Sequence, residues 1–229
     1  AATVVPTSAP SIIASAAVND MSSRATKEET MSAVAVELCS AMVTPNVRAT
    51  LRALTERGGT IVTVDPRFTE TAKLASEHVP IRPGTDAAML IAMTQVIVGE
   101  GRHDQAFLDR LVLGFDEAHL PPGAPPGSSY RSYLFGLSDG IVKTPEWAEP
   151  LTGVPAATIR RLAREFGTLK PAALQTGYAP GRTGYGEQFH RAAYALCAIT
   201  GNVGIPGGNS GCSGGARNHG IKRLGAPPN

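Results

Sequence analysis

The sequence has few of the residues that hold disulfide frameworks or metal clusters. Its three cysteines, Cys39, Cys197 and Cys212, are odd in number, widely spaced and without a C-x-x-C pair. Disulfide frameworks and cysteine-ligated zinc or iron-sulfur centres require even sets or closely spaced pairs of cysteines. We therefore expect neither kind of centre within this chain.

The sequence also lacks the charge pattern and apolar runs of proteins that bind nucleic acids or cross membranes. The 229 residues carry a net charge of +2 with 17% charged residues, and no run of Lys and Arg is interleaved with aromatic residues. This excludes a dedicated nucleic-acid surface. No apolar run reaches the roughly 18 residues needed to cross a bilayer, and no basic segment followed by an apolar one marks a signal peptide.

Composition divides the chain into three parts. Residues 1–45 are rich in Ala, Ser and Thr, although residues 31–42 have apolar side chains at helical spacing and predict a short helix. Residues 46–209 carry the periodic apolar segments of a folded domain, interrupted by a Pro/Gly linker at 121–127. Residues 210–229 are rich in Gly and basic residues, and we expect a mobile tail.

Two segments predict strands buried on both faces of a parallel sheet. Residues 60–64 are β-branched throughout and do not alternate with polar residues. Residues 172–176, which read AALQT, predict the second buried strand. A helical pattern and a glycine turn precede the first strand, as in half of a βαβ unit. The expected fold class is therefore α/β.

The first strand ends in a turn with one acidic and one basic side chain, Asp65-Pro66-Arg67. Ligands of open α/β sheets bind in the crevice outside the carboxyl ends of the strands. We therefore expect Asp65 and Arg67 to face a ligand of the nucleotide type.

A second turn, at residues 82–86, repeats this pattern before an apolar helix predicted over residues 87–98. Thr85 suits the N-cap, so Asp86 would lie at the start of the helix. A carboxylate there can accept two parallel hydrogen bonds from the ring N–H and the exocyclic amine of a guanine. Acidic residues in a first turn also stabilise the helix dipole alone, so both interpretations of Asp86 stay open.

Two glycine-dense loops flank a helix predicted over residues 187–200. The first, residues 177–186, follows the second strand and contains four glycines and Arg182. A strand, a glycine-rich turn and a helix can bring backbone amides to a phosphate, and Arg182 adds a positive charge. The loop has neither G-x-G-x-x-G nor P-loop spacing. The second loop covers residues 201–209.

Three segments resemble the catalytic subunits of the dimethyl sulfoxide reductase family of molybdopterin enzymes, in particular its membrane-anchored anaerobic members. They read VDPRFTETAKLASEHVPIRPGTDAAML, YLFGLSDGIVKTPEWAEPLTGVPAATIRRLARE and ALCAITGNVGIPGGNSG, in the family's order and with its spacing. The resemblance implies a Rossmann-like, doubly wound, mostly parallel sheet with flanking helices, within a larger multidomain enzyme. It also implies a bis(molybdopterin guanine dinucleotide) cofactor whose molybdenum serves oxygen-atom transfer from an S- or N-oxide.

By position, the resemblance assigns cofactor contacts to four loops and assigns no catalytic residue or metal ligand. The assigned residues are Asp65, Pro66 and Arg67 in a dinucleotide-binding turn, Gly84, Thr85 and Asp86 in a guanine-recognising turn, Gly177 and Arg182 in a loop beside the pterin and the substrate funnel, and Gly201 and Asn202 in a loop that closes over the cofactor.

The departures from the family pattern are also informative. Relatives usually have Trp-Gly-Pro-Gln-Arg where this chain has Tyr-Ala-Pro-Gly-Arg at residues 178–182, so the contact of that glutamine is missing. Residues 1–50 resemble neither the family's upstream iron-sulfur cysteines nor its molybdenum ligand, and its C-terminal domain has no counterpart. We therefore expect a central piece of a longer enzyme that is inactive alone. A stand-alone nucleotide-binding module and an inactive fragment are the alternatives.

The resemblance also implies partners and a location. It implies a small-molecule oxide as substrate, an iron-sulfur electron-transfer subunit, a membrane anchor subunit and a periplasmic location.

Overall fold

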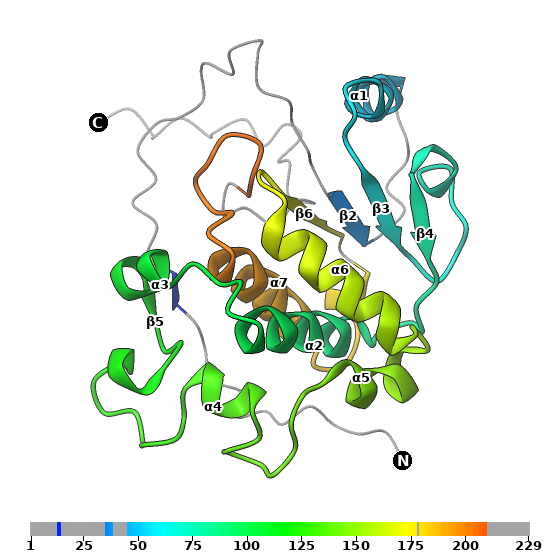
Figure 1. The fold of residues 1–229 in the computed structure, drawn as a ribbon. Helices are drawn as coiled ribbons and strands as arrows, with labels where there is room; N and C mark the ends of the chain where they lie inside the picture. Colours follow the sequence, from blue (N-terminus) through cyan, green and yellow to red (C-terminus); the bar gives the residue numbers. More distant parts are fainter. Residues whose placement is uncertain (1–12, 15–34, 39–44, 178, 210–229) are drawn as a thin grey trace, which may run out of the picture.

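The structure, a computed structural model, describes residues 13–14, 35–38, 45–177 and 179–209. Most of residues 1–45 and the predicted mobile tail at 210–229 lie outside this part. A four-stranded parallel sheet, in the order β4-β3-β2-β6, forms one layer of the domain (Figure 1). Its strands are β2 (Ala35–Leu38), β3 (Ile61–Val64), β4 (Glu77–Val79) and β6 (Ala173–Thr176). A separate antiparallel pair joins β1 (Ile13–Ala14) to β5 (Val112–Leu113).

The two strands predicted from the sequence are confirmed, but their burial differs. All four residues of β3 are buried, as its unbroken β-branched run predicts. In β6, Leu174 and Thr176 are buried whereas Gln175 is exposed. The prediction that β6 is buried on both faces is therefore wrong, because β6 pairs only with β2 and is the last strand of the described sheet.

The helix predicted over residues 31–42 is wrong where the structure describes this segment, because Ala35–Leu38 forms strand β2. This strand lies inside the sheet, where Val36 pairs with Val62 of β3 and Leu174 of β6. Apolar residues four apart share one face of a helix, but they also share one face of a strand, since side chains alternate with a period of two. Pairing with two distant strands decided between these structures.

Helices connect and cover the strands. They are α1 (Pro45–Glu56), α2 (Asp86–Gly99), α3 (Gln105–Leu111), α4 (Tyr130–Leu134), α5 (Pro145–Thr152), α6 (Ala156–Thr168) and α7 (Glu187–Ile199), with the 3-10 turns η1 (Ala72–Leu74), η2 (Glu117–His119) and η3 (Pro180–Arg182). Helix α2 packs against α5, α6 and α7 (Figure 1). Because α2 is apolar on nearly all sides and eleven of its residues are buried, it forms the centre of the helical core.

The ends of α5 show how local sequence sets a helix. The side chain of Thr144 accepts a hydrogen bond from the Trp147 amide, Pro145 occupies the first turn, and Gly153 ends the helix with φ at 75°. A glycine tolerates this left-handed conformation because it has no Cβ. The linker at residues 121–127 lies between η2 and α4, and its last amide, that of Gly127, donates to Glu117 Oε2 (2.8 Å).

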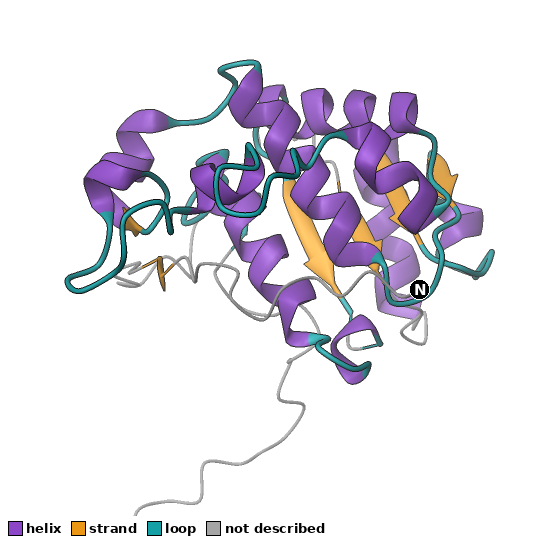
Figure 2. Cartoon of the chain, turned by 90° about the horizontal axis from the view of Figure 1, so that it is seen from below, coloured by secondary structure: helices purple, strands orange, loops and turns teal. Residues whose placement is uncertain are grey.

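Since the four strands are parallel, their carboxyl ends lie at one edge of the sheet, which we call the carboxyl edge. The strand arrows in Figure 1 point down toward this edge, and Figure 2 views the molecule from that side. The opposite end is the amino edge. Within the described ranges, no helix combines the length and the apolar character needed to span a bilayer.

Candidate functional site

Asp65 lies at the carboxyl edge, directly after β3, and its side chain is only 6% exposed. Its Oδ1 accepts a hydrogen bond from the Arg67 amide (2.8 Å), and its own amide donates to the Val79 carbonyl (3.2 Å). His78 Nε2 contacts the Asp65 carbonyl oxygen at 3.0 Å. These contacts fix the turn, so Pro66 and Arg67 are held at the surface beside a buried carboxylate.

Asp86 is the first residue of α2 and is 5% exposed. It lines a cavity of about 10 Å³ with apolar neighbours that include Val64, Ile81 and Met89. Burial raises the pKa of Asp86 to about 6, and the nearby charge of Asp65 adds to the rise. The two predicted turns therefore come together, as expected of segments that follow neighbouring parallel strands.

The described surroundings of Asp86 do not compensate its charge. Among the residues that the structure describes, the interaction that favours its ionised form is a hydrogen bond with its own backbone amide, and no cation of this part of the chain contributes. A buried carboxylate without a cationic or multiple hydrogen-bonding partner is costly in its charged form. A ligand that brings two hydrogen-bond donors to Asp86 would relieve that cost.

Thr85 occupies the N-cap position of α2, but its hydroxyl does not cap the helix. The hydroxyl instead donates to the Arg82 carbonyl (2.7 Å) and so tightens the turn. Arg82 Nη1 donates to the carbonyls of Pro150 and Leu151, at 2.8 and 2.7 Å, which fastens the turn to the end of α5. The predicted N-cap position is confirmed, and the turn is held by contacts from a distant helix.

Gly84 lies where the second turn meets the glycine-rich loop. Its φ of +77° is a conformation that L side chains rarely adopt, and a Cβ added there would lie 3.8 Å from Thr183 Cγ2. The turn at 82–86 and the loop at 177–186 are therefore neighbours. This brings Gly84, Thr85 and Asp86 to the same edge as the loop that carries Gly177 and Arg182.

Glycines 181 and 186 have a packing role in the loop. A Cβ on Gly186 would lie 2.4 Å from the Pro180 carbonyl oxygen, and one on Gly181 would lie 2.4 Å from His190 Nε2. Gly184, by contrast, has no atom within 4 Å of an added Cβ. The loop is thus folded tightly on itself and on α7, with Arg182 exposed.

Gly201 and Asn202 are not brought to this edge. Asn202 Oδ1 accepts from the amide of Ala172, which precedes β6, so the side chain lies at the amino edge. Its Nδ2 donates to Thr200 Oγ1 (2.9 Å), and the residue is fully buried. A Cβ on Gly201 would lie 2.5 Å from Asp104 Oδ2. The Asn202 side chain therefore has hydrogen-bond partners within the domain, at the end of the sheet opposite to the Asp65 turn.

Sequence reasoning did not single out Phe68 and His78, which lie beside the Asp65 turn. The ring centroids are 5.3 Å apart in an edge-to-face arrangement, and Phe68 is 63% exposed. An aromatic residue next to a predicted ligand-binding turn was a usable signal for Phe68. His78 had no such signal, because only the pairing of β4 with β3 brings it to Asp65.

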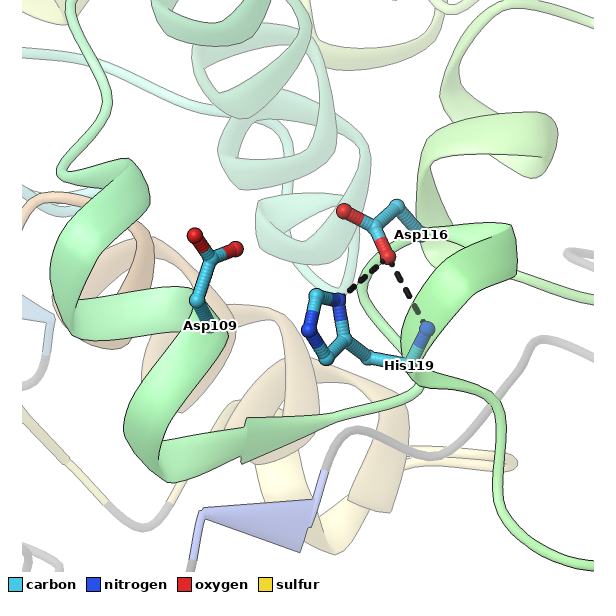
Figure 3. Close-up of side chains that lie close together, drawn as sticks. All are labelled: Asp109, Asp116 and His119. Atoms are coloured by element: carbon cyan, nitrogen blue, oxygen red, sulfur yellow. Dashed lines mark hydrogen bonds and ion pairs between the residues drawn. The ribbon is translucent and has the colours of Figure 1, made fainter.

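Asp109, Asp116 and His119 form a separate cluster whose possible ligand atoms lie within 4.8 Å of one another (Figure 3). Asp116 Oδ1 accepts hydrogen bonds from His119 Nδ1 (2.8 Å) and from the amides of Ala118 and His119. Asp116 is therefore the N-cap of η2. Capping accounts for this contact, and we assign the cluster no ligand.

Comparison with known proteins gives one family match and several relatives. The family model described as molybdopterin oxidoreductase matches residues 29–229. The chain is 49% identical over 153 residues to dimethyl sulfoxide reductase DmsA of Escherichia coli, which is 66% of this chain and 19% of that protein. It is 36% identical over 166 residues to the dimethyl sulfoxide/trimethylamine N-oxide reductase of Cereibacter sphaeroides, covering 72% of this chain and 19% of that protein.

Among solved structures, the fold is similar to that of acetylene hydratase from Pelobacter acetylenicus. The TM-score is 0.61 at 24% identity, covering 73% of this chain and 21% of that one. This similarity concerns the fold alone. The chain spans about a fifth of the length of the curated relatives named above.

Proposed function

The chain belongs to the molybdopterin oxidoreductase family, and from this premise we propose that it holds the guanosine end of a molybdopterin guanine dinucleotide within a longer enzyme. We propose further that the whole enzyme carries the bis form of this cofactor and reduces an S- or N-oxide of the dimethyl sulfoxide type. Its similarity to dimethyl sulfoxide and trimethylamine N-oxide reductases supports this substrate class. Bound molybdenum would supply the two-electron oxygen-atom transfer.

The observation that carries the proposal is the uncompensated carboxylate of Asp86. It is buried, its pKa is raised to about 6, and it lies near Asp65 at the carboxyl edge. Guanine presents two adjacent N–H donors on one edge, and two parallel hydrogen bonds to an ionised carboxylate are strong ones. The two donors of a guanine edge therefore match the acceptors of Asp86 and would replace the water that this carboxylate loses on folding. The cavity of about 10 Å³ beside Asp86 has room for about one water, so it would have to open to admit the base.

The strand order supports a ligand at this edge. The chain proceeds from β2 to β3 and β4 on one side, and then returns to β6 on the other side of β2. In doubly wound α/β sheets, ligands bind where the winding direction reverses. We therefore retain the Rossmann-like, doubly wound description as part of the proposal, with its reversal between β2 and β6.

The other loops would position the same ligand. Gly84 leaves room beside Thr183, and Gly177 begins the loop that follows β6. Arg67 and Arg182 are exposed positive groups at this edge, suited to the phosphates of a dinucleotide. We do not include Gly201 and Asn202 in the site, because their contacts lie at the amino edge.

The proposal extends to partners only through resemblance to the family. An iron-sulfur subunit would deliver electrons, a membrane anchor subunit would hold the complex, and the enzyme would work in the periplasm. The iron-sulfur cluster within the catalytic subunit would belong to a part of the longer enzyme upstream of this segment.

Titration of the 229-residue chain with nucleoside diphosphates tests the guanine site. We expect guanosine diphosphate to bind at least tenfold more tightly than inosine diphosphate, which lacks the exocyclic amine and so one hydrogen bond to a charged acceptor. Adenosine diphosphate and NAD should bind more weakly still. A preference for NAD would favour the stand-alone nucleotide-binding module, and no binding of any nucleotide would favour the inactive fragment.

The enzyme assignment is tested on the full-length protein. Molybdenum and guanine nucleotide should both be released by acid, and the loaded protein should reduce dimethyl sulfoxide with a dye donor. Protein that contains neither molybdenum nor guanine would contradict the assignment.

A further inference from the structure

Phe68 is an aromatic side chain displayed at the carboxyl edge without an apolar covering. Among the described large apolar residues, its 63% exposure is exceeded only by the 78% of Leu137. Leu137 lies in the loop after α4, whereas Phe68 lies three residues after Asp65. An exposed aromatic ring next to a ligand site offers a flat apolar surface to a planar ligand.

The ring of Phe68 is held in place from one side. It meets the His78 ring at an interplanar angle of 79° with centroids 5.3 Å apart. His78 is itself held by the contact of its Nε2 with the Asp65 carbonyl oxygen at 3.0 Å. The Arg67 amide, one residue before Phe68, donates to Asp65 Oδ1. Phe68 is therefore oriented by the same turn that brings Asp65 close to Asp86.

We propose that Phe68 is the stacking platform for the purine base bound at the carboxyl edge, and that His78 is a positioning residue for its ring. This inference rests on the proposed function and adds a second contact to it. Asp86 would read the hydrogen-bonding edge of the base, and Phe68 would bind its face. Stacking on an aromatic ring is tolerant of base identity, because every base has a π-face.

The two contacts therefore make separable contributions to binding. Loss of the edge contact should reduce the preference for guanine over hypoxanthine. Loss of the stacking contact should lower the affinity for both bases by the same factor and leave the preference for guanine unchanged. A Phe68 that merely packs against another part of the longer enzyme would affect neither quantity in this chain.

The test is calorimetric titration of the 229-residue chain with guanosine and inosine diphosphates. We expect Phe68→Ala to weaken both ligands about tenfold, with their ratio unchanged, and Phe68→Tyr to retain wild-type affinity. The matched control is Leu137→Ala, which removes an even more exposed apolar side chain from the loop after α4 and should change neither affinity. Since Phe68 is exposed, its replacement should leave the unfolding transition in place.

A spectroscopic measurement gives a second readout. Trp147 is the only tryptophan of the chain, so Phe68→Trp adds one fluorophore at the proposed platform. Guanosine diphosphate should quench its emission, and ribose 5-phosphate, which has no base, should not.

The outcomes separate this inference from the proposed function. If wild-type chain discriminates guanosine from inosine diphosphate but Phe68→Ala binds both as the wild type does, the stacking proposal is overturned and the guanine site stands. If wild-type chain binds no guanosine diphosphate, the proposed function fails, and the platform fails with it.

Discussion

Asp86 and Asn202 are both buried polar residues, one at each edge of the sheet, and their surroundings differ. Asn202 donates to Thr200 Oγ1 and accepts from the Ala172 amide, so its side-chain oxygen and nitrogen both have protein partners. Asp86 has apolar neighbours and a nearby acidic residue, and its pKa is raised to about 6. Burial alone therefore does not distinguish a polar residue that we propose to bind a ligand from one whose partners all lie within the protein.

The two residues differ in the partners that satisfy their side-chain hydrogen bonds. A buried group whose partners are all within the protein stabilises the fold, because an unmade hydrogen bond is expensive. A buried carboxylate whose charged form is disfavoured destabilises the apo protein at neutral pH and becomes favourable when a ligand supplies donors. The hydrogen bonds of Asn202 thus stabilise the fold at the amino edge, and the carboxyl edge is where we propose that the ligand binds.

The largest expected effect is that of Asn202→Leu. Removing this side chain leaves the buried Ala172 amide without its acceptor, while the Thr200 hydroxyl loses one donor and still donates to the Leu196 carbonyl. A leucine at this fully buried site also has to be packed, so the free energy of unfolding should fall by about 3 kcal/mol. Urea denaturation measures the loss. The ratio of the affinities for guanosine and inosine diphosphates should stay at the wild-type value. A changed ratio would contradict the claim that the amino edge takes no part in guanine recognition.

Asp86→Asn should act in the opposite direction. At pH 7.5 it replaces a buried charge by a neutral amide of similar size, so the free energy of unfolding should rise, by at most about 3 kcal/mol for a pKa raised from 3.8 to about 6. The variant should also lose the preference for guanine, because an amide has one acceptor where the carboxylate has two. A destabilised variant that still prefers guanine would contradict both roles of Asp86.

Gly186→Ala tests the rigidity of the loop at the carboxyl edge. Its Cβ would lie 2.4 Å from a backbone oxygen, so the loop must shift, and we expect a loss of about 2 kcal/mol in the free energy of unfolding. The matched control is Gly184→Ala, whose Cβ meets no atom within 4 Å and should change stability by less than about 0.5 kcal/mol. Equal effects of the two substitutions on thermal unfolding would refute the close packing of this loop.

The smallest effect is the pH dependence that Asp86 imparts. The pKa of Asp86 is higher in the folded protein than in the unfolded chain, so the native state binds the proton more tightly. Proton binding by Asp86 therefore stabilises the native state at low pH, and this stabilisation is lost as the pH rises from about 4 to above 6. The advantage of Asp86→Asn over wild type should therefore shrink by about 1.4 kcal/mol between pH 7.5 and pH 5. Paired urea titrations of variant and wild type at the two pH values measure this difference in the free energy of unfolding. A difference that does not change with pH would mean that the pKa of Asp86 is not raised by folding.

Elements set by local patterns were predicted correctly. The run at residues 60–64 became β3, and the apolar segment after Thr85 became α2. The connection between β3 and β4 forms only the 3-10 turn η1. Such short connections depend on the strands that they join, because they have too few residues to form a stable helix alone.

The candidate site was predicted less completely than the fold. Asp65 and Asp86 were recognised from their places at the ends of predicted strands, but their closeness follows from the pairing of β3 with β4. The neighbouring positions of Gly84 and Thr183 join segments about a hundred residues apart, for which no local pattern exists. The placement of Asn202 at the opposite edge was also beyond sequence reasoning, because the direction of α7 sets it.

The sequence by itself determined the α/β class, the strand at residues 60–64, the apolar helix after Thr85, and membership of the family through three ordered segments. Tertiary structure alone decided that residues 35–38 form a strand inside the sheet, that Asp86 is buried near Asp65, and that the Asn202 side chain bonds to the Ala172 amide at the amino edge. The physical reason is that side-chain periodicity and capping act within a few residues, whereas burial, charge interaction and strand pairing depend on groups that only the folded chain brings into contact.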